Sequence, residues 1–194
     1  MIRDKPLHNF LFEMEESDFY KNLNTHSTPW IDVCCILSLI KYHKPKNLLE
    51  IGTHYGHTTK IISDKFPHLD ITTTDPGDKI LLNNRPSNQH GEYLEQNEIG
   101  KMFLGNNKIK LIKNDIHDIQ FFDEKFDFIF IDGNHSYNSV IKDTQLSLNI
   151  LNTNGVIVWH DWDNVKDVNA ALNEFNLGKP IIHIHNTWIA YYES

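Results

Sequence analysis

The chain has 194 residues, 40% of them hydrophobic, which is enough for one domain with a sizeable core. Its formal net charge of −8 excludes a basic footprint of the kind that nucleic-acid binding requires, so no nucleic-acid partner is expected. Two adjacent cysteines favour free thiols, and the absence of a signal-peptide pattern or of a run near the ~20 apolar residues of a membrane span predicts a cytoplasmic protein without membrane contact.

Apolar and polar residues alternate between strand-like and helix-like patterns along the chain. Short continuous apolar runs are typical of parallel strands buried on both faces, and apolar residues at helical spacing predict amphipathic helices. Helices are expected at 29–43, 57–65, 93–104, 136–151 and 163–175. Strands are expected at 47–51, 70–74, 108–113, 126–131, 156–159, 181–185 and 188–192.

This alternation predicts an α/β fold in which helices cover both faces of a sheet. We expect a Rossmann-like, doubly wound, mostly parallel seven-stranded sheet with a C-terminal antiparallel strand. A single domain over 1–194 is expected, with an N-terminal extension at 1–27. The polar segment 78–92 has little periodicity and is interpreted as a lid loop.

A glycine loop follows the first predicted sheet strand. Gly52 and Gly56 let the backbone turn sharply and let a ligand approach bare main chain, and the helix that follows offers unpaired N–H groups to an anionic group. Glu50, just before the glycines, would repel a diphosphate but attract a cationic ligand. The loop therefore predicts a nucleotide-like cofactor that carries positive charge.

Asp75 ends the strand 70–74, roughly 20 residues past the glycine loop. In doubly wound folds a carboxylate at this distance accepts hydrogen bonds from ribose hydroxyls. The alternative is a simple turn at Asp75-Pro76-Gly77, which is a favoured turn sequence.

Two further polar blocks each end a predicted parallel strand. They are Asp132-Gly133-Asn134-His135-Ser136-Tyr137 and His160-Asp161. Because ligands bind at the carboxyl edge of such sheets, we expect these side chains to converge there.

Together the motifs resemble those of the class I S-adenosylmethionine-dependent methyltransferases. E-x-G-x-x-x-G at Glu50 is similar to their motif I, and D-G-x-H-x-Y followed by G-V-I-V-x-H-D is similar to a branch of small bacterial and viral members. The resemblance covers nearly the whole chain from about Thr28, and its closing pattern is 183–191. It implies S-adenosyl-L-methionine as cofactor, bound by Glu50, Gly52, Thr53, Tyr55, Gly56, Thr58, Asp75, Asp115, Ile116 and Asp132. Asp115 would lie near the adenine amino group and Ile116 against its ring.

The resemblance also implies two versions of the catalytic site. In metal-dependent O-methyltransferases of the catechol and caffeoyl-coenzyme A type, an Asp and an Asp-Asn pair hold a divalent ion, and the matching positions here are Asp132, His160 and Asp161. A nitrogen ligand suits magnesium poorly and favours manganese, iron or zinc. In the second version His135 or His160 is a metal-free general base for an acceptor hydroxyl. Of the two, the sequence reasoning favours the metal-free histidine.

The acceptor implied by the resemblance is a small hydroxylated metabolite, sugar or glycan, methylated on oxygen. Candidates to contact it are Tyr55, Tyr137, Trp159, Trp162, Arg85, Gln89 and His90. Three other functions stay open: a nicotinamide-dependent oxidoreductase, a metal-dependent hydrolase, and a cofactor-binding scaffold without turnover, for example as a subunit of a homodimer. The oxidoreductase should show G-x-G-x-x-G, whereas His54 stands where the second glycine would be.

Overall fold

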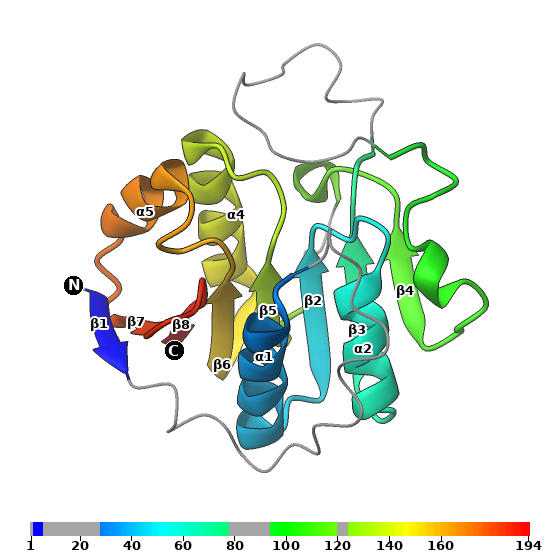
Figure 1. Ribbon diagram of the computed structural model, residues 1–194, viewed down its shortest axis with the longest axis horizontal. Coiled ribbons are helices and arrows are strands. Elements are labelled where there is room, and N and C mark those ends of the chain that lie inside the picture. Colours follow the sequence, from blue (N-terminus) through cyan, green and yellow to red (C-terminus); the bar gives the residue numbers. More distant parts are fainter. Residues whose placement is uncertain (1, 6–27, 78–93, 120–123) are drawn as a thin grey trace.

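The computed structural model describes residues 2–5, 28–77, 94–119 and 124–194 (Figure 1). The expected lid loop 78–92 and most of the expected N-terminal extension lie outside the described residues. Within the described ranges, no helix is both long enough and apolar enough to cross a membrane.

Strands of the described chain form one eight-stranded sheet in the order β1-β7-β8-β6-β5-β2-β3-β4. Only β8 runs antiparallel, to β6 on one side and β7 on the other. The predicted mostly parallel α/β sheet with an antiparallel C-terminal strand is therefore confirmed, and β1, from the expected N-terminal extension, adds an eighth strand parallel to β7. The strands are β1 (Ile2–Lys5), β2 (Asn47–Ile51), β3 (Asp70–Thr74), β4 (Ile109–Ile112), β5 (Phe126–Ile131), β6 (Leu151–Trp159), β7 (Ile181–Ile184) and β8 (Ala190–Glu193).

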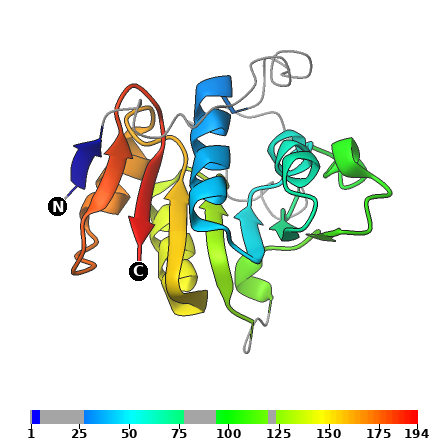
Figure 2. The same ribbon diagram turned by 90° about the horizontal axis from the view of Figure 1, so that it is seen from below.

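Helices cover both faces of the sheet, as predicted (Figures 1 and 2). Helices α1 (Trp30–His43) and α2 (His57–Lys65) lie on one face, and α4 (Tyr137–Ile150) and α5 (Lys166–Asn173) lie on the other. Successive side chains of a strand point to opposite faces. In β5, Phe128 and Phe130 therefore join the core under α1, while Ile129 and Ile131 join the core under α4 and α5.

The predicted helix at 93–104 is wrong over the described residues. This segment forms turns and a single short 3-10 helix, η3 (Lys101–Phe103). Two of its backbone N–H groups bond to the glycine loop: Gly100 donates to the His54 carbonyl at 2.9 Å and Met102 to the Tyr55 carbonyl at 3.1 Å. The N–H groups of Glu98, Lys101 and Phe103 close short turns within the segment. Hydrogen bonds between this segment and the glycine loop form in place of the predicted helix. They connect the segment to the backbone of His54 and Tyr55.

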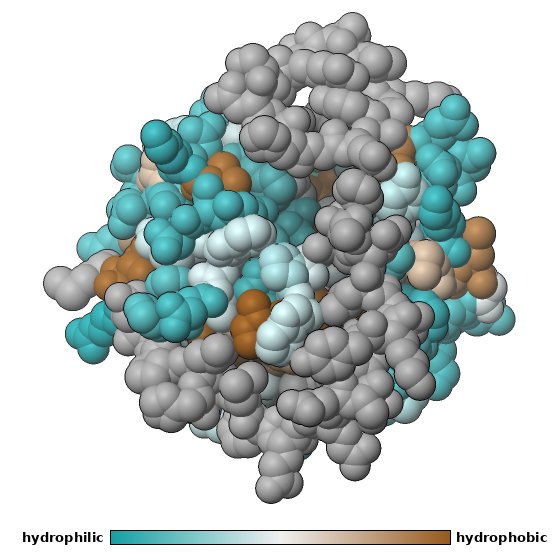
Figure 3. All heavy atoms as spheres, viewed as in Figure 1, coloured by the Kyte–Doolittle hydropathy of each residue, from teal (hydrophilic) through white to brown (hydrophobic). Residues whose placement is uncertain are grey.

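The strand order brings the predicted functional segments to one edge. Strand β2 lies between β3 and β5, and β5 pairs in parallel with β6. The residues that follow these four strands therefore end side by side. On the face seen in Figure 3, hydrophilic residues prevail among the described ones, and hydrophobic residues form small separate patches.

Candidate active site

The two loop glycines are required by packing between chain segments. Gly52 has φ +102°, and a Cβ atom there would lie 2.1 Å from the backbone carbonyl oxygen of Asp132. Gly56 has φ +83°, and a Cβ atom there would lie 2.3 Å from the ring of Phe103. The sequence interpretation gave these glycines to a ligand. In the structure, the missing side chains let the loop pack against the end of β5 and against η3, and the approach of a ligand to this loop stays a prediction.

Glu50 lies beneath this loop and is 1% exposed. Its carboxyl accepts hydrogen bonds from the hydroxyls of Thr59 and Thr73. Burial raises the pKa of Glu50 to about 8 against those two hydrogen bonds, and the negative charges of Asp132 and Asp75 raise it further. Because the carboxyl is covered, we expect it to act on a bound cation through its charge.

Asp75 connects the end of β3 to the glycine loop. One carboxylate oxygen accepts from the His54 N–H at 2.8 Å, and the other accepts from the Gly77 N–H at 2.9 Å. The hydrogen bond from the Gly77 N–H closes the Asp75-Pro76-Gly77 turn, which the sequence analysis gave as the alternative to ribose binding. Each oxygen keeps a second lone pair, so the turn and ribose binding are compatible.

The remaining predicted cofactor residues are spread around this edge. Thr53 shares a 2.6 Å hydrogen bond with Thr73, and Tyr55 lies under the Lys101 ammonium, 3.9 Å from its ring centroid. After β4, Asp115 caps a short 3-10 helix, η4 (Ile116–Asp118), by accepting from the His117 N–H at 2.9 Å. Ile116 is buried in the core.

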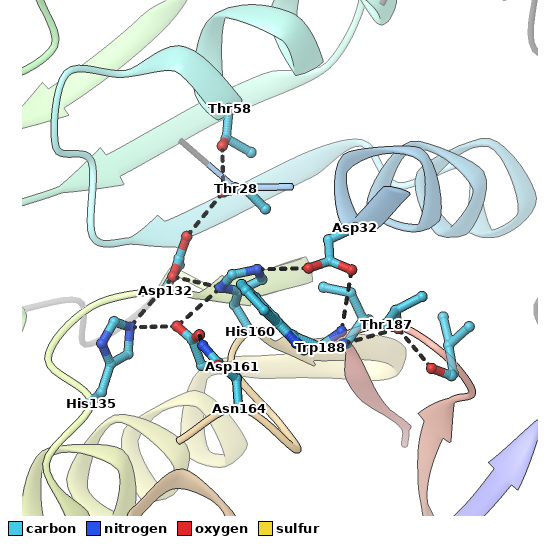
Figure 4. A network of polar contacts seen from close by, with 12 residues as sticks. Thr28, Asp32, Thr58, Asp132, His135, His160, Asp161, Asn164, Thr187 and Trp188 are labelled. Carbon is cyan, nitrogen blue, oxygen red and sulfur yellow. Dashed lines mark hydrogen bonds and ion pairs between the residues drawn. The ribbon is translucent and has the colours of Figure 1, made fainter. Parts of the chain in front are cut away.

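Four predicted residues from the ends of β5 and β6 converge on one point (Figure 4). His160 Nδ1 lies 3.2 Å from Asp132 Oδ1 and 3.1 Å from Asp161 Oδ2. His135 Nε2 lies 3.0 Å from the same Asp161 oxygen and 3.6 Å from the same Asp132 oxygen. We call Asp132, His135, His160 and Asp161 the edge cluster.

A fifth member of this network was not predicted. Asp32, on α1, is 1% exposed, and its Oδ2 lies 3.0 Å from His160 Nε2. Its Oδ1 accepts from the backbone N–H of Trp188 at 3.2 Å. The only signal in the sequence was an acidic residue inside the apolar pattern of the first helix, at a position that packing would bury.

Polar contacts also hold the outer oxygens of the cluster carboxylates. The Thr28 hydroxyl donates to Asp132 Oδ2 at 3.3 Å and shares a hydrogen bond with Thr58 at 3.1 Å. The Asn164 amide donates to Asp161 Oδ1 at 2.6 Å. These contacts fix the carboxylates in place and leave the inner oxygens facing the histidines.

The local charges shift the ionisation of the cluster strongly. Burial by itself would lower the pKa of His135, but Asp132 and Asp161 outweigh it and raise that pKa to about 9. Burial would raise the pKa of Asp132, but His160 and His135 outweigh it and hold that pKa at about 2. By the same balance the pKa of His160 lies well above its ordinary value and that of Asp161 well below.

Backbone strain helps to aim one of these groups. Asp161 adopts φ +61°, in the left-handed region that costs most non-glycine residues on the order of 1 kcal/mol. The following turn is closed by a 3.2 Å bond from the Asn164 N–H to the Asp161 carbonyl. This conformation directs the Asp161 carboxylate back toward His135 and His160.

Aromatic residues differ in how they lie around the cluster. Trp159 is 1% exposed and donates its indole N–H to Thr144 at 2.9 Å, so it is a core residue. Trp188, which was not predicted, packs edge-on to His160 with ring centroids 5.9 Å apart and is 37% exposed. Tyr137 is also 37% exposed.

A family model described as a methyltransferase domain matches residues 49–162, more than half of the chain. The chain therefore belongs to this methyltransferase family. It is an S-adenosylmethionine-dependent methyltransferase, as the motifs indicated.

Solved structures agree with the fold. The O-methyltransferase NovP superposes with a TM-score of 0.65 at 13% identity, over 88% of this chain and 82% of that one. A candidate caffeoyl-CoA O-methyltransferase from Staphylococcus aureus gives a TM-score of 0.61 at 17% identity, over 84% of this chain and 82% of that one. The O-methyltransferase from Bacillus cereus, in complex with S-adenosylhomocysteine, gives 0.56 at 16% identity, over 95% and 87%. No curated protein matches the chain in sequence.

The charges of the site fit this cofactor. S-adenosylmethionine carries a sulfonium and an ammonium. The negative charges of Asp132 and Asp75 lie near enough to Glu50 to raise the pKa of its carboxyl. A cationic ligand would relieve that repulsion, since an opposite charge favours the ionised carboxylate.

Proposed function

We propose that the enzyme transfers a methyl group to a hydroxyl oxygen of a small hydroxylated metabolite, sugar or glycan. The observation that carries the proposal is the contact between the glycine loop and the edge cluster. Gly52 packs on the backbone of Asp132, and Asp132 also faces His135 and His160. A cofactor held at the loop therefore lies beside groups suited to accept or polarise a hydroxyl proton.

The protein takes no covalent part in the methyl transfer. The bound cofactor supplies an activated methyl group, and the chain must align the acceptor with it and exclude water. Asp75 would take the ribose hydroxyls, while Glu50 and Asp132 would balance the positive charge. His160 is 6% exposed and has a carboxylate at each ring nitrogen, so His135 is the histidine placed to face an acceptor.

Two arrangements would remove the hydroxyl proton. His135 takes it directly once it has lost its own proton, which its pKa of about 9 puts at alkaline pH, or a divalent cation held by the cluster lowers the pKa of the hydroxyl. Both need Asp132 and Asp161 at the positions that the structure gives them.

The acceptor class is supported by the surroundings of the cluster. Trp188 packs against His160 and is 37% exposed, so its open side suits a ring with polar edges, such as a sugar. A net charge of −8 disfavours polyanionic acceptors, including nucleic acid. We place the enzyme in the cytoplasm because Cys34 and Cys35 are buried free thiols.

The test is turnover with S-adenosylmethionine and a panel of sugars, glycans and small hydroxylated compounds, with S-adenosylhomocysteine release and product mass as readouts. Methylation on oxygen is the expected result. Tight S-adenosylhomocysteine binding with no product from any acceptor would favour the scaffold function, and methylation on nitrogen or sulfur would contradict the proposal.

A further inference from the structure

His117 and Asp143 form a polar contact outside the edge cluster. Nε2 of His117, in η4, lies 2.8 Å from Oδ1 of Asp143, on α4. The Asp143 side chain is 7% exposed and that of His117 is 34% exposed. Neither residue belongs to the edge cluster or to the predicted cofactor residues, so the contact has no role in the reaction described so far.

The backbone of His117 holds the carboxylate of Asp115. The His117 N–H donates to Asp115 Oδ1 at 2.9 Å, and the Asp118 N–H closes the same turn by donating to the Asp115 carbonyl at 3.1 Å. His117 therefore contacts the predicted adenine residue through its main chain and α4 through its side chain. Because each carboxylate oxygen has two lone pairs, Asp115 keeps the capacity to accept from an amino group.

Asp143 connects this loop to the end of a second strand. Its other oxygen, Oδ2, lies 3.8 Å from the position that a Cβ atom of Gly133 would take. Gly133 directly follows Asp132, which is another predicted cofactor residue. The contact thus joins the loop after β4 to the loop after β5, although β3 and β2 lie between these two strands.

The loop after β4 has few other supports in the described part of the chain. Strand β4 is the last strand of the described sheet, with β3 as its neighbour. Ile116 packs in the same core as Val140 of α4. Apolar packing is non-directional, so it does not by itself orient the Asp115 carboxylate.

The charges of the pair favour a retained contact. The hydrogen bond to Asp143 raises the pKa of His117, and burial raises the pKa of Asp143, so both directions keep a proton between the two side chains. Of the nearby charges, Asp115 raises both pKa values and Lys142 lowers both. A buried ion pair contributes little net stability compared with well-packed apolar residues, so we expect its main effect on orientation.

We propose that His117 and Asp143 are positioning residues for the cofactor, because their contact directs the Asp115 carboxylate to the amino group of the adenine. This inference goes beyond the proposed function, since it concerns recognition of the cofactor and holds for any methyl acceptor. It uses the assignment of Asp115 to adenine that the family resemblance implies.

The competing explanation is a contact that only attaches η4 to α4. Its loss would then loosen the whole loop and lower the affinity for every form of the cofactor equally. A positioning role instead affects ligands that carry the adenine amino group and spares ligands that lack it.

Calorimetry of the full-length protein with two ligands separates these explanations. The ligands are S-adenosylhomocysteine and its analogue in which hydrogen replaces the adenine amino group. The wild type should prefer S-adenosylhomocysteine about 10–100-fold, the range for a hydrogen bond to a charged group. His117→Ala and Asp143→Ala should lower this preference at least about fivefold and change the affinity for the analogue less than about threefold. Asp143→Asn keeps an oxygen for His117 and should restore most of the preference.

His68→Ala is the matched control, because His68 is an exposed histidine that contacts Phe66. It should keep the preference of the wild type. Thermal unfolding identifies any variant that does not fold. If His117→Ala is such a variant, His117→Leu replaces it, since leucine keeps an apolar side chain there and removes the donor.

Three results would overturn the proposal: no preference in the wild type, an unchanged preference in the folded His117 variant, or an equal loss of affinity for both ligands. Turnover with the acceptor panel is a separate measurement. Absence of any O-methylated product would remove the proposed function and leave the adenine preference to be measured. A failed preference test on protein that produces an O-methylated product would remove only the positioning role.

Discussion

The two halves of the active site are built in different ways. The cofactor half consists of the glycine loop after β2, Asp75 after β3, and the segment around η3, and backbone contacts hold it together. The edge cluster is held by side chains from β5, β6 and α1 that are far apart in sequence. Because backbone contacts hold the cofactor half, we expect it to tolerate substitutions of polar side chains but not substitutions that add a side chain to a glycine. A side-chain-built half should lose function through single polar substitutions while the fold persists.

Gly52→Val tests the contact that the halves share, and we expect the largest effect from it. The new side chain would meet the Asp132 backbone at 2.1 Å on a residue with φ +102°. We expect no measurable S-adenosylhomocysteine binding, no turnover, and a loss of unfolding free energy of several kcal/mol. Calorimetry and chemical unfolding measure these quantities.

Gly178→Val is its control. Gly178 has φ +77°, but a Cβ atom there has no neighbour within 4 Å. This variant carries the backbone strain without the steric overlap, so it should keep cofactor binding. Equal behaviour of the two variants would mean that strain, and not the packing of Gly52 on Asp132, decides the result.

His135→Ala tests whether the edge cluster works separately from the cofactor half. Turnover should fall on the order of 100-fold or more, the range for loss of a group that handles the acceptor proton. S-adenosylhomocysteine affinity should change less than about threefold, because the ion-pair partners of His135 among the described residues are the cluster carboxylates of Asp132 and Asp161. A parallel loss of both quantities would show that the two halves are one cooperative unit.

Asp75→Ala tests ribose recognition. Loss of charge-assisted hydrogen bonds of roughly 1.5–3 kcal/mol predicts a ten- to hundredfold lower affinity for S-adenosylhomocysteine. Asp75→Asn should lose less, since an amide oxygen still accepts from the His54 N–H. If calorimetry gives one affinity for all three proteins, Asp75 serves only the turn with Gly77.

Glu50→Gln tests the pH dependence of stability and should leave the fold unchanged. The pKa of Glu50 is raised from 4.5 to about 8, so between these values the folded protein holds a proton that the unfolded chain releases. Its unfolding free energy should therefore fall with rising pH in that window, by up to about 1.4 kcal/mol per pH unit for this proton. Urea unfolding of cofactor-free protein across this range should show a flatter profile for Glu50→Gln. Identical slopes would contradict a raised pKa.

Local patterns predicted most of the elements because their packing follows directly from their sequence. The ranges of β2, β3, β5 and α2 match the expected ones. Segment 94–104 was misread because Phe103 packs against Gly56, and because Gly100 and Met102 donate their backbone N–H groups to the glycine loop. Strand β1 was missed because four residues at a sheet edge carry little pattern of their own.

The sequence by itself determined the α/β class, the methyltransferase motifs and the convergence of Asp132, His135, His160 and Asp161 at one sheet edge. Those features follow from strand order and from residues that directly follow strands. Only the tertiary structure decided that Gly52 makes room for the Asp132 backbone and that Asp32 of α1 holds His160. These contacts join residues 80 or more positions apart in the printed sequence. No local periodicity encodes such contacts, because they depend on how whole helices and strands pack.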